Sequence, residues 1–160
     1  MYDGEKLEWK IENQPFIYEP IRVAIKRIEE KKYCPLMAFF IKDERVIRTE
    51  CGSPDSVKST KRILSLWEGW LKEYKINTFL LIFQRKDQSY LVVNIFTREQ
   101  DVGGVIPFIR SGETIKCDAV SWDRDEEIQF ALQKMAQSYF KWWPGQDDDQ
   151  VDNDDLNTDL

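Results

Sequence analysis

Aromatic and basic side chains are the residues of this sequence whose types and spacing best suit binding chemistry. The chain has six tryptophans, and indole rings stack on nucleic-acid bases and contribute strongly to protein interfaces. Most of them fall at helical spacing, which is typical of core packing. A helix cannot turn both Trp142 and Trp143 to the same core, so at least one ring should be exposed. We predict a partner-binding surface made by these residues: Trp70, Trp142, Trp143, Lys58, Lys61, Arg62, Arg85 and Lys86.

The chain contains no histidine, which is the commonest general base and nucleophile activator in enzymes. Ser-His-Asp, Cys-His and HExxH sites are therefore excluded within this chain. Cys34, Cys51 and Cys117 are too far apart for a Cys-x-x-Cys zinc or redox site, and we expect reduced, partly buried thiols. Gly103 and Gly104 lack the further glycine of a dinucleotide-binding loop, and we interpret them as a flexible turn. The sequence predicts no catalytic residue, no metal site and no cofactor, and therefore a protein that is not an enzyme.

Carboxylates are plentiful and leave one catalytic alternative open. Asp55, followed by Glu73 and Lys75, is comparable to the acidic residues of nucleases that coordinate magnesium. However, Asp55 lies at an expected helix start, where a negative charge favours the helix dipole, and Glu73 lies at the end of the same helix. A carboxylate-dependent or metal-dependent enzyme is kept as a hypothesis without an assigned pair of residues.

Strands are expected where apolar residues alternate or run continuously. A hairpin is predicted between 78–83 and 90–96, because a polar loop joins two apolar runs. A proline is tolerated in a strand only where no ladder hydrogen bond is needed, so Pro107 predicts an edge strand. The other expected strands cover residues 6–13, 36–41, 46–51 and 115–120.

Three helices are predicted from apolar spacing and capping residues. The first covers about 20–32 and starts at Pro20. The second covers about 54–75, with Ser53 as its N-cap and a core stripe that begins at Val57. The third covers about 124–142 and begins with a capping box of Asp123 and Glu126.

The order of these elements is roughly β-α-β-β-α-β-β-(β-β)-α, which predicts an α+β single domain. We expect a mostly antiparallel or mixed sheet with about three helices, packed mainly on one face. The globular domain should span residues 1–144, and residues 145–160 should form a disordered acidic tail. The 29 acidic residues of the chain include seven in this tail, so 22 acidic and 23 basic residues remain in 1–144, a formal charge of +1. The acidic residues of the tail are Asp147, Asp148, Asp149, Asp152, Asp154, Asp155 and Asp159.

The first residues show no signal-peptide pattern, and the longest apolar runs are far shorter than the roughly 20 residues of a membrane helix. We therefore expect a cytoplasmic protein that does not bind a membrane. The leading hypothesis is a non-catalytic interaction or accessory protein that binds a protein partner through an aromatic-edged surface and the acidic tail. The alternative is a single-stranded nucleic-acid-binding protein in which the tail competes with the nucleic acid. The sequence does not define an oligomeric state.

Overall fold

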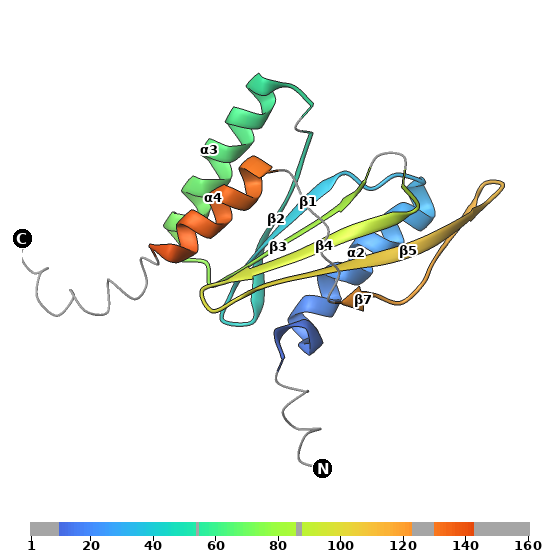
Figure 1. Ribbon diagram of the computed structural model, residues 1–160, viewed down its shortest axis with the longest axis horizontal. Helices are drawn as coiled ribbons and strands as arrows, with labels where there is room; N and C mark the ends of the chain where they lie inside the picture. Colours follow the sequence, from blue (N-terminus) through green and yellow to red (C-terminus); the bar gives the residue numbers. More distant parts are fainter. Residues whose placement is uncertain (1–9, 54, 86–87, 123–129, 143–160) are drawn as a thin grey trace, which may run out of the picture.

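The computed structural model describes residues 10–53, 55–85, 88–122 and 130–142. These residues form a seven-stranded antiparallel sheet with three α-helices (Figure 1). The α+β class and the approximate element order predicted from the sequence are confirmed. The helices and the 3₁₀ turn are η1 (Ile11–Asn13), α2 (Pro15–Lys31), α3 (Val57–Tyr74) and α4 (Phe130–Lys141). The strands are β1 (Leu36–Lys42), β2 (Arg45–Gly52), β3 (Thr78–Gln84), β4 (Tyr90–Thr97), β5 (Asp101–Ser111), β6 (Thr114–Cys117) and β7 (Ser121–Trp122).

The sheet has the strand order β2-β1-β3-β4-β5-β6, and β7 pairs with β5 beside β6. The predicted hairpin of β3 and β4 is confirmed, with Thr78 opposite Thr97 and Gln84 opposite Leu91. β1 is the central, fully covered strand that its continuous apolar sequence predicts, and it pairs with both β2 and β3. β2 lies at the edge of the sheet, and most of its side chains are exposed.

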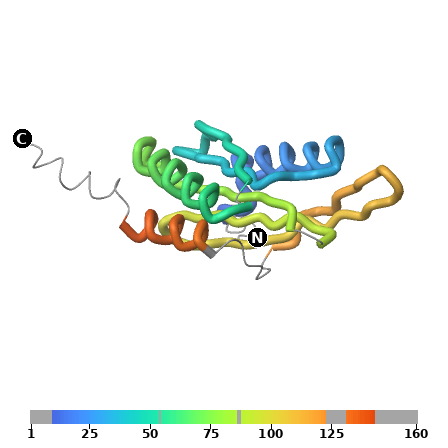
Figure 2. Tube along the Cα trace, turned by 90° about the horizontal axis from the view of Figure 1, so that it is seen from above, coloured from blue at the N-terminus to red at the C-terminus, as the bar shows by residue number. Residues whose placement is uncertain are grey.

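Helices cover both faces of the sheet, which corrects the expectation that they pack mainly on one face. α2 covers one face, where Ile17 and Ile28 pack with Phe39 of β1. α3 and α4 lie side by side on the other face, where Trp67 and Leu132 pack with Phe40 of β1 (Figures 1 and 2). Phe39 and Phe40 point to opposite sides because successive side chains of a strand alternate. A continuous apolar strand therefore requires a cover on each side.

The first helix begins five residues before its predicted start. Pro15 occupies a first-turn position and Pro20 lies inside α2, where it is buried. The interior proline costs helix stability, but Ile17 is fully buried against the sheet, and that burial favours the longer helix. The strand predicted for 6–13 is wrong where the structure describes it, because Ile11–Asn13 is a 3₁₀ turn, while residues 6–9 lie outside the described residues.

The second helix begins at Val57 with Ser56 as its N-cap, so Ser53 is not the cap. The Ser59 backbone N–H donates to Ser56 Oγ at 3.0 Å, and the Ser56 backbone N–H donates to Ser59 Oγ at 3.1 Å. This reciprocal capping box satisfies two donors at the helix end. Val57 was predicted to begin the core stripe of this helix, but it is 74% exposed and is therefore not a core residue. Asp123 and Glu126, the capping box predicted for the third helix, lie outside the described residues.

Gly103 and Gly104 form part of strand β5 instead of a flexible turn. A Cβ atom at Gly104 would lie 2.6 Å from Cε3 of Trp122 and 3.1 Å from the carbonyl oxygen of Ser121. Gly104 is thus required by the close approach of β7. β5 is also not an edge strand, because it pairs with β4 on one side and with β6 and β7 on the other. Pro107 is tolerated because it lies where β5 passes from pairing with β7 to pairing with β6.

None of the α-helices in the described residues has the length and apolarity that crossing a lipid bilayer requires.

Candidate functional site

The outward side of α3 carries a shallow groove that we call the α3 groove. It has a volume of about 510 Å³, and Gly69, which has no side chain, leaves open space at its centre. Leu66 is 48% exposed beside it, although an amphipathic helix normally turns leucine to the core. The residues that line the α3 groove are Arg62, Ser65, Leu66, Gly69, Trp70 and Glu73.

Trp70 is held at the border of the α3 groove by contacts with the sheet. Its ring meets Phe40 edge-on, with the ring centroids 5.8 Å apart, and Cζ of Arg48 lies 3.6 Å from its centroid. Arg48 also donates from Nε to Glu50 at 2.8 Å and from Nη1 to the Tyr74 hydroxyl at 3.3 Å. These contacts connect α3 to strand β2 and fix the orientation of the indole. Trp70 is consequently half-buried, and Arg48 covers one face of its ring.

The structure brings two of the predicted binding residues together, because Arg62 and Trp70 both line the α3 groove. Lys58 and Lys61 are exposed in the first turns of α3. Arg85 follows the end of β3 and is half-buried. Lys86, Trp143 and the seven tail aspartates lie outside the described residues.

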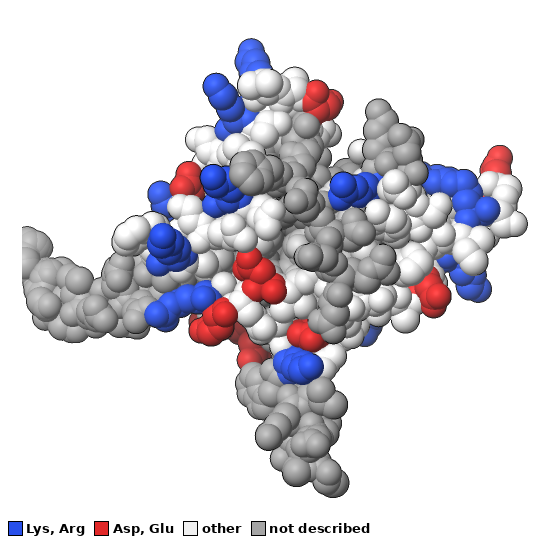
Figure 3. Space-filling view, viewed as in Figure 1, with Lys and Arg blue, Asp and Glu red and all other residues white. Residues whose placement is uncertain are grey.

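Trp142 is 70% exposed at the end of α4, and Nζ of Lys141 lies 5.8 Å from its ring centroid. The end of α4 lies beside the C-terminal end of α3, where the Tyr139 hydroxyl donates to the Ile76 carbonyl at 2.7 Å. Lys58 is 16 residues before Tyr74, which corresponds to about 24 Å along the helix. Trp142 and the first-turn lysines are thus at opposite ends of the helix pair. Figure 3 shows Lys and Arg side chains interspersed with Asp, Glu and neutral surface on the face that carries this helix pair.

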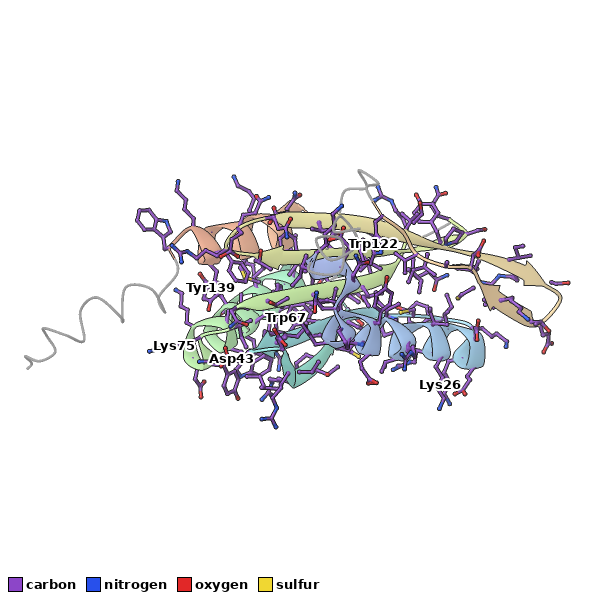
Figure 4. All side chains as sticks on the ribbon, turned by 90° about the horizontal axis from the view of Figure 1, so that it is seen from below. Lys26, Asp43, Trp67, Lys75, Trp122 and Tyr139 are labelled. Atoms are coloured by element: carbon purple, nitrogen blue, oxygen red, sulfur yellow. The ribbon has the colours of Figure 1, made fainter. Side chains whose placement is uncertain are left out.

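A second pocket, of about 450 Å³, lies at one end of the sheet and is rich in carboxylates and amides. Its polar groups already make structural hydrogen bonds. Asn77 Nδ2 donates to Asp43 Oδ1 at 3.1 Å and joins two turns, and within the 97–100 turn the Gln100 backbone N–H donates to Thr97 Oγ1 at 3.1 Å. Figure 4 shows Asp43 at the same end of the molecule as Lys75 and Tyr139, opposite Lys26. Among the described residues, no group of three or more Cys, Asp or Glu side chains is arranged to hold a metal ion. We therefore interpret this pocket as a structural junction of turns.

The thiols are poor candidates for nucleophiles where they are buried. Burial raises the pKa of Cys34 to about 12, although Arg27 opposes this shift. Burial also raises the pKa of Cys117 to about 11, and the nearby Glu29 carboxylate adds to the effect. Because the thiolate is the reactive form, we expect both thiols to react slowly at neutral pH.

Four of the six residues of the α3 groove were not predicted from the sequence: Ser65, Leu66, Gly69 and Glu73. The sequence did contain a signal for this groove. Leu66 and Gly69 lie off the core stripe that contains Leu64, Trp67 and Leu71. An apolar residue next to a mid-helix glycine on the outer face indicates a contact surface. Arg48 was missed because its stacking on Trp70 joins residues far apart in the sequence.

Comparison with protein-family models, curated proteins and solved structures gave no significant match.

Proposed function

We propose that this protein is a non-catalytic interaction module that binds a protein partner through the α3 groove. The observation that carries the proposal is the groove itself, in which an exposed leucine and the indole of Trp70 surround the open space at Gly69. Tryptophan and arginine are enriched among the residues that contribute most to protein interfaces. An exposed apolar patch beside charged residues is typical of such contacts.

Preorganisation also supports this proposal. Trp70 is clamped between Phe40 and Arg48, so binding would require little loss of its conformational entropy. Arg62 and Glu73 are exposed at the two ends of the groove, where opposite charges can orient a partner. Where the partner carries a basic region, the acidic tail would add a second contact to it.

The nucleic-acid alternative has less support. A stacking platform needs exposed ring faces beside a continuous row of cations, whereas Arg48 covers one face of Trp70 and Trp142 lies at the opposite end from Lys58. A cytoplasmic location is part of our proposal, because Cys34, Cys51 and Cys117 are free thiols.

Site-specific photo-cross-linking tests the proposed function. A benzophenone amino acid is placed at Ser65 in the α3 groove and, in a matched control, at Ile109, which is 73% exposed on β5. Both versions are irradiated as the purified chain and in an extract of the source cells. We expect defined protein adducts from position 65 that the substitution Leu66→Glu abolishes, and none from position 109. An absence of specific adducts at position 65 in both samples would overturn the proposed function.

A further inference from the structure

The residues of the α3 groove are arranged symmetrically along the helix, about the peptide bond between Trp67 and Glu68. Leu66 and Gly69 lie equally far from this point on its two sides. The same is true of Ser65 and Trp70, and of Arg62 and Glu73. Each pair joins a large residue with a small one, or a cation with an anion.

We propose that the α3 groove binds a second copy of this chain, with the two α3 helices packed antiparallel about a two-fold axis. This inference rests on the proposed function, because it names the partner of the same surface. In a two-fold contact, each residue of one copy faces the symmetric position of the other. A surface whose two halves are complementary in size and charge therefore fits itself.

Size complementarity is the first argument. When two antiparallel helices pack about this centre, Leu66 of one copy lies at the same height as Gly69 of the other. It enters the hole between Leu66, Gly69, Trp70 and Glu73, which have the i, i+3, i+4, i+7 spacing of knobs-into-holes packing. Apart from the helix's own backbone, no atom of the described residues lies within 4 Å of a Cβ atom built at Gly69, so their packing leaves this space open. Ser65 lies at the height of the partner's Trp70 but on the opposite edge of the interface, so the bulky indole flanks the contact and leaves its centre to Leu66 and Gly69.

Charge complementarity is the second argument. The same symmetry places Arg62 of one copy opposite Glu73 of the other, twice in the dimer. Within one chain these residues are 11 positions apart, about 17 Å along the helix, which is too far for an ion pair. Both side chains are exposed, and neither takes part in the ion pairs found among the described residues. Like charges at these two positions would instead have disfavoured an antiparallel contact.

The neighbouring edge strand β2 is a less suitable site for self-association. Its pairing with β1 shifts between Phe40 and Ile41, which leaves Ile47 as an extra residue in a bulge. Bulges and charged side chains such as Arg45 protect sheet edges from pairing with another chain. The helix face is the part of this side of the molecule that is complementary to itself.

The contact is small, so the dimer should be weak. A face of about 17 Å along one helix supplies less than the roughly 800 Å² per partner of a stable interface, and we expect a dissociation constant on the order of 10–1,000 µM.

Substitutions that reverse the charges of Arg62 and Glu73 in the full chain test this inference. Sedimentation velocity measures the dissociation constant of the dimer at protein concentrations up to about 1 mM. We expect concentration-dependent dimers of the unsubstituted chain. Arg62→Glu alone and Glu73→Arg alone should each weaken the dimer about tenfold, because each brings like charges together twice. An equimolar mixture of the two single variants should form mixed dimers of near-original affinity, and the variant with both substitutions should dimerise again. Both sites are exposed, so the fold of the monomer is expected to persist, and circular dichroism verifies it.

Restoration of the dimer when the two single variants are mixed is specific to a two-fold self-contact. An unrelated partner would keep its own charges and would not compensate for either substitution. A chain that stays monomeric up to about 1 mM overturns the inference. It is also overturned if the single substitutions leave the dissociation constant of the dimer unchanged, or if the mixture of the two variants does not restore dimerisation. The cross-linking experiment separates this failure from that of the proposed function. Adducts with another protein alone would retain the proposed function and reject the second copy, whereas an absence of any adduct rejects both.

Discussion

The three cysteines differ in burial, and that difference controls the chemistry of each thiol. Cys34 is buried and Cys117 is half-buried, while Cys51 is exposed on the edge strand β2. Loss of hydration disfavours the thiolate, which is why the pKa values of Cys34 and Cys117 rise to about 12 and about 11. The raised pKa values disfavour the reactive thiolate at Cys34 and Cys117, whereas Cys51 is accessible to reagents.

Thiol labelling checks this difference. At pH 8 we expect a disulfide reagent to modify Cys51 of the native chain first, and Cys34 and Cys117 at least about tenfold more slowly. The substitution Cys51→Ser should remove the fast phase, whereas Cys34→Ser should leave it unchanged. Full denaturation should make all three thiols react at one rate. A fast phase that persists in the Cys51→Ser variant would contradict the burial described above.

Two glycines inside regular elements show opposite reasons for lacking a side chain. Gly104 lies in β5 under the ring of Trp122, where a Cβ atom would clash. Gly69 lies in the middle of α3, and no side chain in the described part of the chain comes within 4 Å of its Cβ position. The first glycine is needed by the packing of the monomer. The second lowers helix stability by about 1 kcal/mol relative to alanine and is not needed by that packing.

Alanine substitution at these glycines should therefore change stability in opposite directions. Gly104→Ala should lower the free energy of unfolding by roughly 1–3 kcal/mol, because Trp122 or the backbone of Ser121 must move. Gly69→Ala should raise it by up to about 1 kcal/mol. Urea denaturation at low micromolar concentration measures both changes without interference from self-association. Equal effects of the two substitutions would show that the contact at Gly104 does not constrain the strand.

Charge is distributed very unevenly over the whole molecule. Residues 1–144 carry a formal charge of +1, while the segment after Gly145 contains seven aspartates and no Lys or Arg. The described core residues on both faces of the sheet lie between Ile17 and Phe140. The described core residues and most of the net charge thus lie in different parts of the chain.

Removal of residues 145–160 separates these contributions. We expect the free energy of unfolding to change by less than about 0.5 kcal/mol, because no described core residue is lost.

In the proposed dimer, however, two tails repel each other, so the shortened chain should associate more tightly at low salt. This advantage should disappear near about 0.5 M salt, where charges are strongly screened. Sedimentation velocity at two salt concentrations provides the measurement, and a salt-independent difference would exclude repulsion as the cause.

The sequence alone predicted the types of most elements, because their signals are local. Two apolar runs joined by a polar loop predicted the β3–β4 hairpin, and the apolar stripe through Trp67 and Leu71 predicted α3. The continuous apolar run of 36–41 also predicted the strand β1. The residue types of Arg62 and Trp70 led us to predict both as contact residues, and the structure places both on the α3 groove, although their binding role stays a prediction. Each of these inferences depends on residues within a few turns or one strand of each other.

Only the tertiary structure decided the features that depend on residues far apart in the chain. The start of α2 depends on the burial of Ile17 against the sheet, and the place of Gly104 in a strand depends on Trp122. The orientation of Trp70 depends on Arg48 of β2. Burial and side-chain contacts depend on which helices and strands pack together in the folded protein. A local sequence pattern does not specify which other element will pack against it.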